Sequence, residues 1–329
     1  MTGTTATVDV VTRIGSGVAV GVVGAAVTAL VAVVVRRRLP TSTVPIAGLL
    51  LVAAAVAALH RAGPETLVSR RLVIGLAVLA AGPTLVTIVG ATRRRRSPAW
   101  TSLLAAVPGA LLVADAAARA GNHPGPWARP LVLVTALVGG AAAAASDRAT
   151  APAGLGPVLV ALACCAAFTT LPDTEQIGAV AGVALPFALV GAPVALARLG
   201  PGAYAVCGLL AWSAAVGGTG RPGAAIGAVA GLGVLLVLPA ARWVRRGHAH
   251  LPTRPLDRRA LTLTAVQAVT LVVTARVAGL RQSLGGAAVV AGPMLLVTLA
   301  AVVVVLGPTR RATPDPAPPR TMARNEPTR

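Results

Sequence analysis

Long apolar runs separated by short clusters of arginine dominate this chain, and they restrict its fold more than any other feature. A helix needs about 20 predominantly apolar residues to cross a bilayer. Low-charge stretches near this length occur eleven times, at 15–35, 44–59, 72–92, 99–118, 130–146, 155–171, 174–197, 203–217, 223–243, 260–279 and 286–307. The sequence therefore predicts an all-α fold, a polytopic transmembrane helix bundle of about eleven spans with short loops and no soluble domain.

The composition agrees with this prediction. Hydrophobic residues make up 56% of the chain and charged residues 12%, whereas a soluble domain has about 45–50% apolar and about 25% charged residues. Charged residues gather between the apolar runs, so few are left to cover helix faces in water. This pattern is typical of a membrane protein.

The arginine clusters predict the orientation in the membrane. The first apolar run is too long for a cleavable signal peptide, and its strongest positive cluster, Arg36 to Arg38, follows it instead of preceding it. With the N-terminus outside and eleven alternating spans, 20 of the 29 arginines lie on the inner side, as positively charged loops prefer. We therefore expect a multi-pass protein of the plasma membrane, with a short extracytoplasmic N-terminus (1–14), a helix bundle (15–307) and a disordered cytoplasmic tail (308–329).

The fifth and eighth spans, 130–146 and 203–217, are the weakest because both are short. The eighth is nevertheless required by the charge distribution. Without it, the arginine-rich segment 242–259 would lie outside, against the positive-inside bias.

Every basic residue other than histidine is an arginine, which we interpret as the coding bias of a GC-rich bacterial genome. The net charge of +20 is explained by the clusters that follow apolar runs, where they contact anionic headgroups on the cytoplasmic side. Aromatic residues are only 2% of the chain, too few for a base-stacking surface, so we expect no nucleic-acid partner.

Midspan ionisable residues are the best functional indicators in a membrane protein, because a charge at the bilayer centre is costly. The predicted spans hold none at their centres, and Gln267 is the main polar residue there, expected to bond its own helix or a neighbour. This weakens the case for proton- or sodium-coupled transport. His248 and His250 in an inner loop have no nearby Cys or acidic partners, so we expect no metal site and no cofactor.

Polar residues near the outer ends of several spans form the candidate site. The set comprises His60, Glu65, Asp115, Arg119, His123, Asp173, Glu175 and Arg276, and the same side also holds Arg61, Arg70, Arg71 and Arg221. Asp115 and Arg119 lie four residues apart on one helix face, and Asp115 is expected to pair with Arg119 or Arg276. A salt bridge that ties helix ends together is the main interpretation, and ligand binding is the alternative. A glutamate with a histidine also has the chemistry for acid–base work on a lipid headgroup or lipid-linked sugar.

The segment TTLPDTEQIG (169–178) places two carboxylates between the sixth and seventh spans. Asp173 is predicted to cap the following helix, with Gln176 three residues later as in a capping box. Glu175 then lies in the first helical turn, where the helix dipole favours an anion. The alternative is a role in binding a cation or a basic partner at the outer surface.

Glycine and proline predict how the helices pack. Gly223, Gly227 and Gly231 repeat at four-residue spacing and offer a contact for membrane-protein partners; the pairs Gly17 with Gly21 and Gly178 with Gly182 share this spacing. Such small residues let helix backbones approach closely. Prolines inside spans, at positions 83, 108, 186, 193 and 293, are expected to kink or break their helices.

Three classes of function fit these features. The first is a non-catalytic membrane component of an envelope assembly, and it is favoured because no recognisable catalytic motif is present. The second is a permease or flippase for a small or lipid-linked substrate. The third is a membrane enzyme that acts on lipid-linked substrates at the outer face.

Overall fold

The computed structural model of the chain describes residues 3–38, 47–61, 69–92, 99–120, 125–149, 175–191, 200–217, 258–281 and 283–305, with single residues between 222 and 240. All regular structure in these segments is helical, and none of them contains a strand. The helices are α1 (Gly3–Arg38), α2 (Ala47–Arg61), α3 (Arg70–Thr92), α4 (Ala99–Ala118), α5 (Ala128–Val134), η1 (Thr135–Gly139), α6 (Gly140–Ala149), α8 (Glu175–Gly191), η2 (Gly200–Gly202), α9 (Ala203–Gly217), α11 (Arg258–Gly279) and α12 (Leu284–Val305).

Five helices are long and apolar enough to cross a membrane. Their apolar segments are Ile14–Val31, Arg70–Gly90, Trp100–Ala118, Ala128–Ala145 and Gly285–Val305, which overlap the predicted first, third, fourth, fifth and last spans. These helices are compatible with a membrane protein. The count of about eleven spans is not confirmed: the predicted 155–171 and most of 223–243 lie outside the described residues.

Four further predicted spans contain helices within the described residues. The spans predicted at 44–59, 174–197 and 203–217 contain α2, α8 and α9, with 15, 17 and 15 residues. In α11, only Ala265–Ala278 forms an apolar helix, because charged and polar residues precede it. The described apolar part of each is below the roughly 20 residues that cross a bilayer without tilt or local thinning.

The predicted fifth span, 130–146, lies in a longer helix than its sequence suggested. It is helical from Ala128 through Ala149, with one π-helical turn at Thr135–Gly139. A Cβ added at Gly140 would lie 2.7 Å from the Cα atom of Tyr204 in α9. The π-helical turn is wider than an α-helical turn, and the glycine that follows it has no side chain. The contact between this helix and the backbone of α9 lies directly after this turn.

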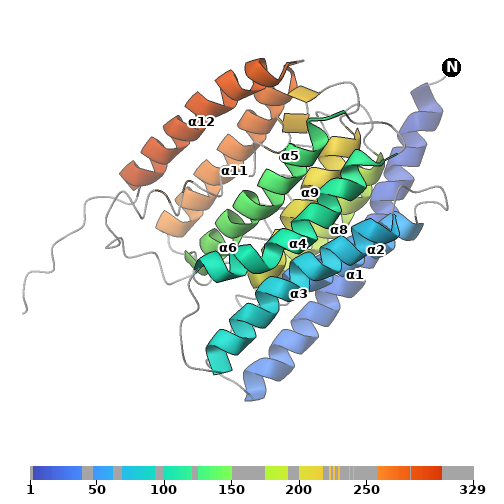
Figure 1. Cartoon of the computed structure of the whole chain (residues 1–329), viewed down its shortest axis with the longest axis vertical. Coiled ribbons are helices and arrows are strands. Elements are labelled where there is room, and N and C mark those ends of the chain that lie inside the picture. Colours follow the sequence, from blue (N-terminus) through green and yellow to red (C-terminus); the bar gives the residue numbers. More distant parts are fainter. Residues whose placement is uncertain are drawn as a thin grey trace, which may run out of the picture.

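The core lies around α9. Every residue of α9 is buried, and α2, α3, α4, α5, η1, α6 and α8 all contact it. Alanine, glycine and serine fill more than half of its sequence, AYAVCGLLAWSAAVG, and the backbone of α6 approaches it closely where Gly140 meets Tyr204. We call the described helices from α1 to α9 the body of the bundle (Figure 1).

The α1–α8 contact uses the glycines that the four-residue spacing singled out. A Cβ at Gly182 would lie 2.5 Å from the carbonyl oxygen of Ile14, and one at Gly21 would lie 2.7 Å from that of Val183. Gly17 approaches Ala179 in the same way. The predicted close helix approach is confirmed at this crossing, where no larger residue fits.

A second close crossing joins α3 and α4. A Cβ at Gly109 would collide with the backbone of Leu79, and one at Gly82 with the carbonyl of Ala105. The prolines do not interrupt these elements, since α3 continues past Pro83 and α4 past Pro108. The expected break is therefore absent there, because the fixed φ of proline fits a helix and packed neighbours hold the chain.

Pro186 in α8 and Pro293 in α12 also lie within unbroken helices, while position 193 lies outside the described residues. α11 and α12 form a hairpin whose main contacts are with each other. Figure 1 shows this hairpin along one side of the bundle, with α1 on the other. Gly223 packs against the α11–α12 turn, near Arg281 and Ser283; Gly227 and Gly231 lie outside the described residues, so a partner role for the three stays a prediction.

Candidate functional site

Asp115 is the centre of the most charged group of side chains that the structure describes. Its Oδ2 atom accepts a hydrogen bond from Nη1 of Arg71 at 2.7 Å, and its Oδ1 atom accepts one from Nη2 of Arg129 at 2.7 Å. Nε of Arg119 lies 3.1 Å from Oδ2 and 3.3 Å from Oδ1. Both carboxylate oxygens are therefore occupied, and we call these four residues the Asp115 cluster.

Helix direction explains why the cluster forms. Asp115 lies in the last turn of α4, whereas Arg71 and Arg129 lie in the first turns of α3 and α5. Each charge is at the helix end where the macrodipole disfavours it. The charges therefore stabilise one another, not their own helices, and the carboxylate ties three helix ends together.

The cluster is open to its surroundings. The side chain of Asp115 is 22% exposed, and those of Arg71, Arg119 and Arg129 are 51%, 61% and 61% exposed. Exposed ion pairs contribute only about 0.2–1 kcal/mol each. Three guanidinium groups surround one carboxylate, so the cluster keeps an excess of positive charge facing outward.

The sequence located part of this cluster. Arg119 is one of the two partners predicted for Asp115, and Arg71 was placed on the same side. Arg129 was missed, although a charge in the first turn after a predicted loop was a signal for it. Arg276 lies exposed in the last turn of α11 and makes an interaction of its own.

The other predicted site residues do not join the cluster in the part of the chain that the structure describes. His60 is exposed in the last turn of α2. Glu175 is the first residue of α8. Glu65, His123 and Asp173 lie outside the described residues, so the capping role of Asp173 and the pairing of glutamate with histidine stay predictions.

Two buried polar side chains on α11 depart from expectation. Gln267 and Thr274 are completely buried, and within the described part of the chain their polar side-chain atoms have no hydrogen-bond partner. By contrast, the hydroxyls of Thr28 and Thr298 donate to backbone carbonyls one turn earlier in their helices. The expectation that Gln267 bonds its own helix or a neighbour is therefore wrong for the described residues.

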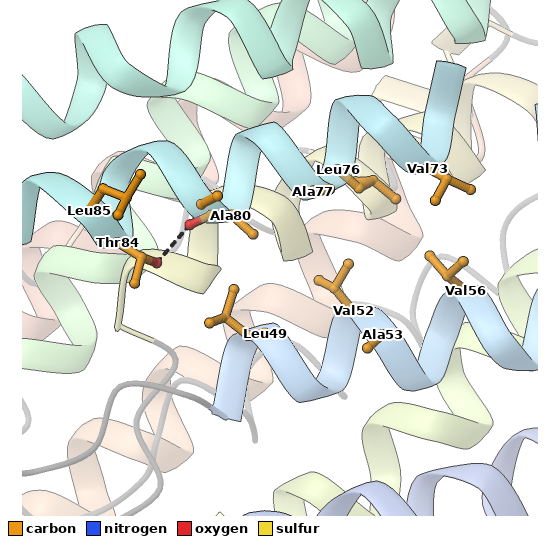
Figure 2. A pocket seen from close by; sticks show the side chains of 11 residues that line it. Leu49, Val52, Ala53, Val56, Val73, Leu76, Ala77, Ala80, Thr84 and Leu85 are labelled. Atoms are coloured by element: carbon orange, nitrogen blue, oxygen red, sulfur yellow. Dashed lines mark hydrogen bonds between the residues drawn. The ribbon is translucent and has the colours of Figure 1, made fainter. Parts of the chain in front are cut away.

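An apolar groove of about 630 Å³ separates α2 from α3 (Figure 2). Val52 and Val56 line one wall, and Val73, Ala77 and Leu85 are among the residues that line the other. Its one polar side chain, Thr84, donates its hydroxyl to the carbonyl oxygen of Ala80 at 2.6 Å. The walls therefore offer no unused hydrogen-bond donor to an occupant.

Among the residues that the structure describes, no three His, Cys, Asp or Glu side chains gather closely enough to hold a metal ion. Comparison of the chain with protein-family models, curated proteins and solved structures gives no match.

Proposed function

We propose that this chain is a non-catalytic integral membrane component of an envelope assembly. It crosses the plasma membrane of a bacterium several times, with its N-terminus outside and its C-terminus in the cytoplasm. The state of Asp115 supports this proposal most strongly. Three arginines occupy the two carboxylate oxygens of this residue. Coupled transport or acid–base catalysis requires a carboxylate that is free to exchange a proton or cation.

The packing of the body also supports a structural role. α9 is covered by neighbouring helices, and backbone-level contacts join α6 to α9, α1 to α8 and α3 to α4. Alternating access needs helices that rock or separate around a central site. Close backbone contacts resist such motion, because separating them loses dispersion contacts along the whole crossing.

A permease or flippase is the second candidate, and the α2–α3 groove is the observation that favours it. The groove is apolar and lies beside Pro83, within one of the helices long enough to span a membrane. A lipid moving between leaflets needs a lateral opening of this kind. A membrane enzyme on lipid-linked substrates has no comparable support among the described residues.

Two measurements on the tagged chain test the structural role. Isolated in mild detergent, the chain of 32.4 kDa should elute in a complex that holds other membrane proteins in fixed stoichiometry. Reconstituted into liposomes, it should move no fluorescent phospholipid between leaflets above the protein-free rate. An isolated chain that accelerates lipid movement would overturn the proposal in favour of a flippase.

The orientation is tested separately by labelling single cysteines at Thr5 and Thr321 in intact cells, with the native cysteines replaced. An impermeant reagent should modify Thr5→Cys before cell lysis and Thr321→Cys only afterwards. Modification of both before lysis would place the two ends on the same side and remove the odd number of spans.

A further inference from the structure

The groove between α2 and α3 is elongated. The two helices run antiparallel, with Val56 across from Val73 at one end and Leu49 near Thr84 at the other (Figure 2). Val73 and Leu85 are twelve residues apart on α3, which corresponds to roughly 18 Å of helix. Half the hydrocarbon thickness of a bilayer is about 15 Å. The groove is therefore as long as one leaflet is deep.

The groove is lined by apolar side chains from both helices along its length. An extended alkyl chain matches such an elongated channel. A helix from a second copy of the chain is the alternative occupant, and the variant tests below distinguish the two.

One end of the groove is cationic. Residues 70, 73, 77, 80 and 84 share one face of α3, so Arg70 continues the wall that Val73 and Ala77 begin. On α2 the same argument places His60 one turn beyond Val56. Both side chains are exposed. Side chains on a helix lean toward its N-terminus, so Arg70 extends beyond the groove and His60 leans back over its mouth.

Neighbouring arginines add positive charge at the Arg70 end of the groove. Arg71 follows Arg70 on α3 and belongs to the Asp115 cluster, which carries three guanidinium groups for one carboxylate. Arg70 forms no ion pair with any residue in the described part of the chain. Its planar guanidinium is therefore available for a phosphate, which it binds with two parallel hydrogen bonds.

We propose that the α2–α3 groove binds one acyl chain of an anionic phospholipid, whose phosphate lies at Arg70 and His60. An apolar channel with no unused donor holds an alkyl chain better than water. The positively charged end of the groove favours an anionic headgroup, and the apolar walls bind the acyl chain. This proposal does not depend on the structural role above, because a scaffold and a flippase can both hold such a lipid.

The test is native mass spectrometry of the delipidated full chain titrated with dioleoylphosphatidylglycerol or dioleoylphosphatidylcholine. One phosphatidylglycerol should bind about tenfold more tightly than phosphatidylcholine. Arg70→Gln should remove this preference, and Arg281→Gln, an equal loss of charge at an exposed position in the α11–α12 turn, should keep it. Inorganic phosphate at the same concentration should not displace the lipid, since it cannot fill the groove.

A matched pair of apolar variants tests the groove itself. Ala77→Phe fills the channel from an exposed lining position, whereas Ala288→Phe adds the same ring at an exposed position on α12. The first should abolish tight binding of both lipids and the second should leave it unchanged, with equal thermal unfolding midpoints. Unchanged lipid binding in Ala77→Phe would overturn the proposal, as would a chain dimer that this variant separates.

Discussion

Helices α9 and α12 are both strongly apolar, yet they lie in opposite surroundings. All 15 residues of α9 are buried, whereas only 17% of the apolar segment of α12 is buried inside the protein. Lipid tails are as apolar as leucine, so hydrophobicity does not draw a helix inward in a bilayer. The two helices differ in valine content: valine occupies two of the 15 positions of α9 and seven of the 22 positions of α12, which exposes Val289, Val297 and Val304.

Burial ranks these two predicted spans in the opposite order to their length. The segment 203–217 is among the weakest predicted spans because it is short, but it forms the centre of the body. The segment 286–307 is one of the clearest predicted spans, and its helix lies at the side in a hairpin with α11. In this bundle, a short helix therefore forms the interior, and a long, valine-rich helix lies at the side.

The largest expected effect comes from the same truncation in the two helices. Leu209 in α9 is 1% exposed and Leu296 in α12 is 67% exposed. Leu209→Ala should lower the free energy of unfolding by about 2 kcal/mol, the low end for buried leucines, because a cavity remains but the leucine returns to lipid on unfolding. Leu296→Ala should change it by less than about 0.5 kcal/mol. Equal losses in a reversible denaturant titration would contradict the comparison.

A smaller effect is expected from adding one methyl group to a glycine in each region. Gly182 lies against the backbone of Ile14, whereas no atom outside its own helix lies within 4 Å of a Cβ added at Gly292. Gly182→Ala should cost about 1–3 kcal/mol through overpacking. Gly292→Ala should be neutral or stabilising by up to about 1 kcal/mol, because alanine favours helix. Thermal unfolding of both variants in the same detergent checks the signs, and a destabilised Gly292→Ala would show that α12 packs more tightly than described.

The smallest effect concerns the charges at the end of the body. Asp115→Ala should lower the free energy of unfolding by about 1 kcal/mol, because it removes three exposed ion pairs and leaves their arginines facing one another. The double variant Asp115→Ala with Arg129→Ala should lose less than the sum of the single variants. Additive losses would mean that the pair contributes no coupling, and the cluster would then not hold α4 to α5.

Helical structure was predictable because it requires only long apolar runs, and a close helix approach at Gly17 and Gly21 was predictable because their spacing lets backbones come together. The partner of each helix was not. Arg129 pairs with Asp115 because α5 begins where α4 ends, and no local pattern records which helix ends meet. The central position of α9 was not predictable for a similar reason, because its burial depends on which helices pack around it.

The α2–α3 groove illustrates the same limit. Its lining residues are ordinary apolar positions in two predicted spans, and nothing in either span alone indicates that the helices separate. Arg70 and His60 were singled out only as outer-side charges. Their common position at one mouth follows from the antiparallel arrangement of α2 and α3.

Photolabelling from within the lipid phase tests the contrast between α9 and α12 most directly. The chain, reconstituted in bilayers, is irradiated with an apolar diazirine probe dissolved in the hydrocarbon region, and the modified residues are located by mass spectrometry. We expect abundant insertion in 284–305, including Val289 and Val304, and none above background in 203–217. Comparable insertion in both segments, or insertion in 203–217 alone, would contradict a body closed around α9 with a lipid-facing hairpin at its side.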